Sequence, residues 1–258
     1  MNFNFNNNNN KLNMKKIYLL ISVLTLTLFL SSCLDEGSRN YSESSVVYID
    51  MDITSGKIYG KSLTGRLIIA NEMLLMQPGT FKFLSYSWDE SYGTTPIADT
   101  YIDNVVISGE PQDVTRKAML LSSPPEVEEP DMFLAVSEPY YVNNDRFLGD
   151  NWLFEYAYES RKGETAEVQL YNVDDPELAE NEVLLEMRLV IGGEAETGAS
   201  LTSKTEIIAF SMAPLRALHE GMSQSNRDLK IRIQYYKKGM DEPVEIPRTY
   251  LLTIGDNA

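Results

Sequence analysis

The sequence predicts an all-β protein in two parts: a small N-terminal barrel or sandwich and a C-terminal antiparallel β-sandwich with one short helix. Many short segments alternate apolar and polar residues with a period of two, as half-buried strands do. Turns rich in glycine and proline separate these segments. Residues 122–131 hold three prolines and four acidic residues, which a central strand does not tolerate. We therefore expect two domains, residues 45–121 and 132–258, joined by this linker.

The first 32 residues have the pattern of a secretory signal peptide. Lysines precede an apolar run of fourteen residues, 17–30, and small residues follow it. The run is too short to cross a hydrocarbon core, which takes about 20 apolar residues. Met14 is a more natural start than Met1, because an asparagine run with no packing value lies between them. Residues 1–13 are therefore expected to be an over-long start.

Cys33 is the only cysteine, and it follows Leu30-Ser31-Ser32 directly. A cysteine in this position resembles the lipobox of bacterial lipoproteins, which implies that Cys33 carries lipid, palmitate included, and becomes the mature N-terminus. With two or more acyl chains such an anchor holds a protein stably on a membrane. Residues 33–44 are small and polar, and we expect them to form a flexible tether. No disulfide is possible within the chain.

The mature chain has 226 residues, and loss of the three leader lysines takes its formal charge from −16 to −19. So acidic a chain repels nucleic acid and anionic lipid, which argues against both as partners. Apolar residues make up 43% of the sequence, enough for an ordinary core.

Strands are expected in order along the first part. Residues 47–53 alternate cleanly, and a turn at 54–57 leads into a second strand from Ile58. The remaining candidates are 80–91, 100–108 (which stops at Gly109-Glu110-Pro111) and 117–121.

The second part has the same character. Its seven expected strands are residues 133–142, 152–160, 167–173, 183–191, 205–211, 229–235 and 250–254. A two-turn helix is expected from Pro214, which suits a first helical turn, to Gly221, which suits the position after the last.

Aromatic residues supply the candidate ligand-binding side chains. Trp152, Phe154, Tyr156 and Tyr158 lie on one face of a strand, opposite Glu155 and Glu159. Since the glutamates take the solvent side, we expect the aromatic face to be core. The alternative is an exposed sugar-stacking platform using Trp152, Tyr156 or Trp88.

No catalytic or metal constellation stands out. His219 is the only histidine, and no Gly-x-Ser-x-Gly motif occurs. One histidine and one lipidated cysteine cannot supply the usual zinc ligands. The carboxylate pairs, Asp89-Glu90 and Asp99 with Asp103, are expected at a solvated surface. The acidic loop at 174–182 lacks the spacing and glycine of a calcium loop. We expect no enzyme activity, cofactor or metal.

Taken as a whole, the chain resembles the NigD-like lipoproteins of Bacteroidetes. The resemblance rests on the order of segments: the lipobox with Leu34-Asp35-Glu36, then residues 183–189, 207–215 and 230–236. It covers most of residues 45–254. It implies an N-terminal OB-like barrel, a C-terminal β-sandwich and an outer-membrane location. The family's founding member is encoded in a bacteriocin operon, and the role assigned to it is immunity.

Two functions are therefore expected. The first is a lipid-anchored cell-envelope binding protein, of an immunity or protective type, whose ligand is a protein or peptide. The alternative is a glycan-binding surface lipoprotein that uses exposed aromatic residues.

Overall fold

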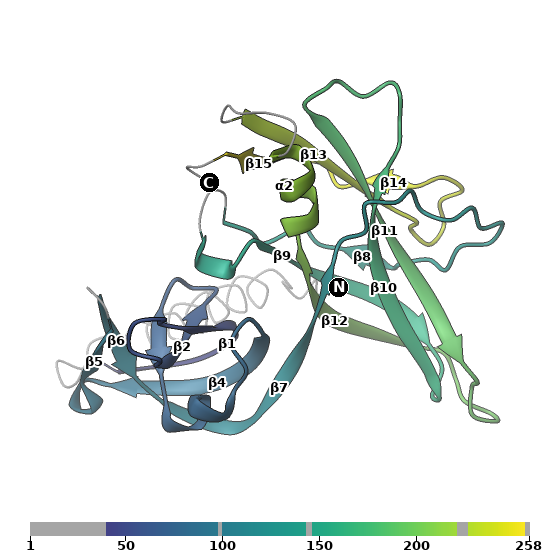
Figure 1. The fold of residues 1–258 in the computed structure, drawn as a ribbon. Coiled ribbons are helices and arrows are strands. Elements are labelled where there is room, and N and C mark those ends of the chain that lie inside the picture. The colour runs from purple at the N-terminus through teal and green to yellow at the C-terminus, as the bar shows by residue number, and fades with distance from the viewer. Residues whose placement is uncertain (1–39, 98–99, 143–145, 221–226, 256–258) are drawn as a thin grey trace, which may run out of the picture.

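A computed structural model describes residues 40–97, 100–142, 146–220 and 227–255 (Figure 1). The all-β prediction is confirmed: the described chain forms a ten-stranded sheet, a five-stranded sheet and one α-helix, α2 (Ala213–Glu220). The signal peptide and Cys33 lie outside the described residues. No helix in the described ranges is long and apolar enough to cross a membrane.

The first part of the ten-stranded sheet comes from residues 40–118. Its elements are β1 (Asn40–Met51), β2 (Ile58–Ser62), β3 (Leu67–Ile69), η1 (Asn71–Leu75), β4 (Phe81–Asp89), η2 (Glu90–Tyr92), β5 (Thr94–Ile97), β6 (Thr100–Asn104) and β7 (Val106–Ala118). β1 pairs with β2 and β4, and β3 pairs in parallel with β6. Only Val105 separates β6 from β7, so one bent segment pairs with β3 at its start and with β4 further on.

These strands curl around a small apolar core that includes Val47, Ile49 and Leu84. The arrangement matches a partly open OB-like barrel. No single unbroken ladder closes it: only the bend between β6 and β7 links β3 to β4, and the hydrogen-bonded path of the sheet keeps ends at β5 and β8.

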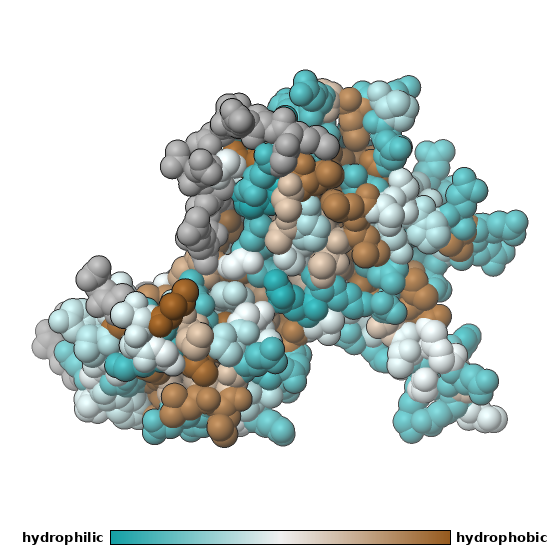
Figure 2. Space-filling view, in the orientation of Figure 1, coloured by the Kyte–Doolittle hydropathy of each residue, from teal (hydrophilic) through white to brown (hydrophobic). Residues whose placement is uncertain are grey.

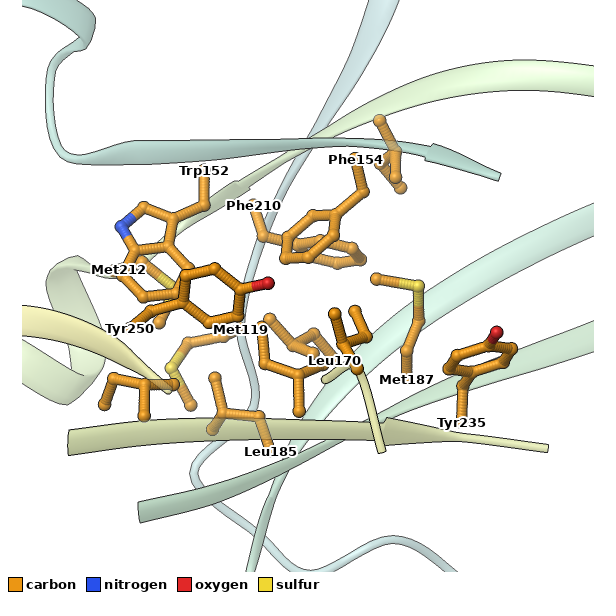
Figure 3. Close-up of a cluster of buried hydrophobic side chains, with 14 of the residues drawn as sticks. Met119, Trp152, Phe154, Leu170, Leu185, Met187, Phe210, Met212, Tyr235 and Tyr250 are labelled. Atoms are coloured by element: carbon orange, nitrogen blue, oxygen red, sulfur yellow. The ribbon is translucent and has the colours of Figure 1, made fainter. Parts of the chain in front are cut away.

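The second part is a sandwich. Its elements are β8 (Ala135–Val136), η3 (Arg146–Leu148), β9 (Asn151–Ser160), β10 (Glu164–Val173), β11 (Glu182–Gly193), β12 (Thr202–Ser211), α2, β13 (Arg227–Tyr235), β14 (Val244–Glu245) and β15 (Tyr250–Ile254). The five-stranded sheet of β10, β11, β13, β14 and β15 packs on β9 and β12 across the largest apolar cluster of the molecule (Figure 3).

The sequence predicts an antiparallel sandwich, but two of its strand pairs are parallel. β11 and β13 are parallel neighbours, and so are β7 and β12. Between β11 and β13 the chain crosses to the opposite sheet as β12 and returns after α2. A parallel pair needs such a long crossover connection, whereas an antiparallel pair can be joined by a tight turn.

Three local expectations were wrong. Residues 40–44, assigned to the tether, belong to β1 and pair with β4 as far as Asn40↔Asp89. β7 does not stop at residues 109–111; the pairing with β4 shifts register there, opposite Leu84, and then continues. The strand expected over 133–142 is only β8, because its neighbours make isolated bridges instead of a ladder.

The two parts are joined through β7 and a third apolar cluster. This junction cluster contains Val46, Phe81, Leu148, Leu153 and Ala209, which come from both parts of the chain. Around it, Arg116 Nε donates to Asn151 Oδ1 at 2.7 Å, and the Tyr140 hydroxyl donates to the carbonyl of Leu63. Residues 122–131 are mostly exposed, and the domain division there stays a prediction.

Candidate functional site

β7 changes partner along its length, and this change creates a fork. Its first part pairs with β4 on both sides of the register shift at residues 109–111, ending at Phe81↔Val114. From Thr115↔Ile208 to Ala118↔Ser211 it pairs in parallel with β12. Before Thr115 and Ile208 the two strands diverge. We call this region the fork; it opens toward the bottom of Figure 1, where Figure 2 shows the two parts of the molecule standing apart.

A groove of 330 Å³ occupies the fork. Its lining residues are Phe83, Gln112, Asp113, Val114, Thr115, Thr205, Glu206 and Ile207. They come from β4, β7 and β12, so the groove lies where the two parts of the molecule meet.

Backbone groups face the groove from both strands. Met119 N donates to Ser211 O at 3.1 Å, so Ser211 directs its carbonyl toward β7. Backbone groups of a strand point to alternate edges with a period of two, so Thr205 and Ile207 use the same edge as Ser211. By the same alternation along β7, the backbone groups of Asp113 point to the edge that faces β12. The ladder between the two strands starts only at Thr115↔Ile208. The backbone groups of Thr205 and Asp113 therefore face the groove outside this ladder.

Glu206 lines the groove and is held in one orientation. Its two carboxylate oxygens accept hydrogen bonds from the Tyr156 and Tyr158 hydroxyls, both at 2.8 Å. Burial, and then the bond to Glu206, raise the pKa of each tyrosine well above its usual value. Both phenols therefore stay protonated donors, and the carboxylate keeps one orientation.

Phe83 and Asp113 complete the groove from β4 and β7. The Phe83 ring is 37% exposed, which is high for a phenylalanine on a paired strand. Asp113 forms an ion pair with Lys82, but its side chain is 83% exposed while that of Lys82 is 19% exposed. The groove thus combines an apolar contact, acidic oxygens and open strand edges.

The aromatic face of β9 is core, and that prediction is confirmed. Trp152 is 2% exposed and Tyr156 is 5% exposed. Figure 3 shows Trp152 and Phe154 pointing into the cluster with Phe210 and Tyr250. Neither Trp152 nor Tyr156 presents a ring face on which a sugar could stack.

Trp88 lies apart, in the curled sheet of the first part. It is half-buried and stacks on Tyr41, with centroids 5.4 Å apart and planes 20° apart. The Arg66 guanidinium lies 3.8 Å from the Tyr41 centroid, and the Tyr41 hydroxyl donates to Asp103 at 3.0 Å. Among the described residues the Trp88 indole N–H has no partner. The structure does not bring Trp88 together with the other two candidates.

His219 lies in the last turn of α2 beside a cation. Its Nδ1 is 3.2 Å from Arg227 Nη2. Burial and the charge of Arg227 lower its pKa, so near neutral pH it is uncharged and gives the helix end no charge.

In the ranges that the structure covers, no three metal-binding side chains gather; of the carboxylates singled out in the sequence, Asp103 accepts from Tyr41, whereas Asp89 and Asp175 make local contacts. Asp89 accepts from the backbone of Ser91 at 2.8 Å. In the acidic loop Asp175 accepts from the backbone of Glu177 at 2.9 Å. Asp99 lies outside the described residues.

The fork was missed by sequence reasoning. Gly109-Glu110-Pro111 was interpreted as the end of a strand, whereas it marks a bulge in a strand that continues. A glycine and a proline inside an otherwise alternating stretch are the signals that could have indicated this.

No protein-family model matches the sequence, and no curated protein matches it. Solved structures do match. A protein of unknown function from Bacteroides vulgatus aligns with 81% of this chain and 91% of its own, at a TM-score of 0.55 and 10% identity. An uncharacterised protein from Parabacteroides merdae aligns with 83% of this chain and 98% of its own, at a TM-score of 0.53 and 12% identity.

A NigD-like immunity protein from Bacteroides caccae aligns with 82% of this chain and 96% of its own, at a TM-score of 0.47 and 11% identity. At these identities the first two matches show a shared two-part β fold and nothing about activity. The structural neighbours of the chain thus include a protein of the family that its sequence resembles.

Proposed function

We propose that the protein is a lipid-anchored protein of the cell envelope that binds a polypeptide partner in the fork. One observation carries the proposal: β7 and β12 direct backbone edges into a groove that begins where their ladder ends. Open strand edges bind extended peptides through main-chain hydrogen bonds, and nearby pockets then select side chains.

The anchor in this proposal is Cys33, with the outer membrane as its location. The immunity-type role that the sequence resemblance implies is a special case, in which the partner is what the protein protects against. The glycan alternative is less well supported, because two of its three aromatic residues are core.

Site-specific photo-cross-linking in intact cells tests the binding site. A photoreactive phenylalanine analogue replaces Phe83, which lines the groove and is 37% exposed. The matched control carries the analogue at Val190 of β11, which is 45% exposed and lies outside the groove. We expect a cross-linked polypeptide from position 83 and none from position 190. Equal cross-linking at both positions, or none at position 83, contradicts the proposal.

Labelled palmitate tests the anchor. The wild type should incorporate the label and sediment with membranes, whereas Cys33→Ala should take up none and remain soluble or unprocessed. The anchor is disproved if the wild type takes up no label and Cys33→Ala still partitions fully with membranes.

A further inference from the structure

We infer that the occupant of the fork is a basic polypeptide segment in an extended conformation, which adds as a strand along the open edge of β12. The inference rests on the proposed function and names the chemistry of its partner. Three observations support it: the open edge of β12, the blunted edge of β7 and the charge of the groove.

The edge of β12 is regular where it is open. Its opposite edge pairs with β9 without a break from Thr202↔Ser160 to Ser211↔Asn151. By the alternation that the Met119–Ser211 bond sets, residues 203 and 205 direct both backbone groups to the fork, and Ile207 offers its N–H there, because its carbonyl faces Thr115 in the ladder. A segment with strand spacing can therefore bond to successive residues of this edge.

Divergence of the fork makes room for one strand. Neighbouring strands lie about 4.8 Å apart, so a third strand fits where β7 and β12 are about 10 Å apart. Two strands that meet at Thr115↔Ile208 and then diverge pass through that separation, and the groove is located there.

The edge of β7 is less suited to pairing. It is interrupted at residues 109–111, where the register shifts. Gly109 has a φ of 79°, and Pro111 has no N–H to donate. Bulges and prolines are devices that prevent pairing at sheet edges. The added strand is therefore assigned to β12, with Asp113 on β7 facing it.

The charge of the groove favours a basic segment as its occupant. Of the described residues that line the groove, only Asp113 and Glu206 are titratable. The side chain of Lys82 is mostly buried, whereas that of Asp113 is exposed. The nearest basic residue along β12 is Lys204, two positions before Glu206. It does not line the groove, and its ammonium lies 5.9 Å from the centroid of the Tyr158 ring. The whole chain has a formal charge of −16, which favours the approach of a cationic partner.

Phe83, Val114 and Ile207 supply the apolar wall of the groove. Side chains of an extended segment alternate between two faces. A segment that alternates basic and apolar residues can therefore contact the wall on one face and the carboxylates on the other.

The probe is a capped peptide of alternating lysine and valine, and the comparison peptide alternates glutamate and valine. Affinity for the intact protein is measured by fluorescence anisotropy at low and at physiological salt. Hydrogen exchange of backbone amides is followed with and without the peptide. We expect binding of the lysine peptide only, weakening with salt, and slower exchange at Thr205 and Ile207.

Variants test the contribution of the groove charge and that of the β12 backbone edge separately. Asp113→Asn should weaken binding about two- to fivefold, the size expected for one exposed ion pair. Its matched control is Glu245→Gln, which removes a partly exposed carboxylate paired with Arg232 in the five-stranded sheet, outside the groove, and should change nothing. Thr205→Pro removes one N–H on the fork edge and should abolish binding, whereas Thr205→Ala should not.

The results distinguish the inference from the proposed function. Equal binding of both peptides, or binding with no slowing of exchange at Thr205 and Ile207, overturns the inference. If cross-linking from position 83 still captures a polypeptide, the proposed function stands with a partner of other chemistry. If position 83 captures nothing, the proposed function itself fails.

Discussion

Phe154 shows how single residues hold the sandwich together. It is fully buried and contacts Phe210 edge-on, with ring centroids 6.1 Å apart. Its neighbour Glu155 points to the other face of β9 and is exposed. Such aromatic pairs contribute about 0.5–1.5 kcal/mol beyond the area that they bury.

Truncation of Phe154 to alanine should cost about 3–5 kcal/mol, because it removes a buried ring and leaves a cavity. Urea unfolding measures the change, and Glu155→Ala is the control, expected to stay within about 0.5 kcal/mol of wild type. Polysaccharide retention is measured on the same variant and on Tyr156→Ala. An unchanged free energy of unfolding together with lost glycan binding would favour the glycan alternative.

At the scale of elements, the short helix α2 depends on its neighbours. A helix of two turns is not stable alone. Leu215 is fully buried, and Arg216 makes two hydrogen bonds of 2.9 Å with the carboxylate of Asp150. The same guanidinium donates to the carbonyl of Thr253 in β15. Asp150 itself has a φ of 62°, the only positive φ at a non-glycine residue in the described chain.

Replacing Arg216 with glutamine should lower stability by about 1.5–3 kcal/mol, since charged hydrogen bonds in a partly buried position are lost. The control is Arg248→Gln, which breaks an exposed ion pair with Glu138 and should have little effect. Thermal unfolding compares the two variants. Equal losses of stability in the two variants would show that Arg216 contributes no more than an exposed surface charge.

At the scale of the whole molecule, the two parts are connected more strongly than a linker alone would connect them. β7 is paired with strands of both parts, and the junction cluster contains residues of both. Residues 122–131 follow β7 and are mostly exposed.

Limited proteolysis should therefore cut first within residues 122–131, yet leave the two fragments associated. Pairing of β7 with β12 and the buried junction cluster do not depend on an intact chain there. Gel electrophoresis under denaturing conditions should show two fragments, and size exclusion should show one particle. Early cuts elsewhere would contradict the linker prediction, and separation of the fragments would contradict the role of β7.

The sequence alone determined the strand content, the buried aromatic face and most strand positions. These features depend on local alternation, which is visible in any window of a few residues. Periodicity at Trp152 to Tyr158 was sufficient because the face toward the core and the face toward solvent differ in polarity.

Only the tertiary structure decided which strands are neighbours, and with them the candidate site. Strand pairing depends on long-range contacts: β7 pairs with β12, which lies some ninety positions later in the sequence. The fork arises because β7 leaves one partner and joins another, and no local pattern encodes that exchange. Its groove depends on backbone edges left open by the pairing, so their position could be known only once every strand had its partner.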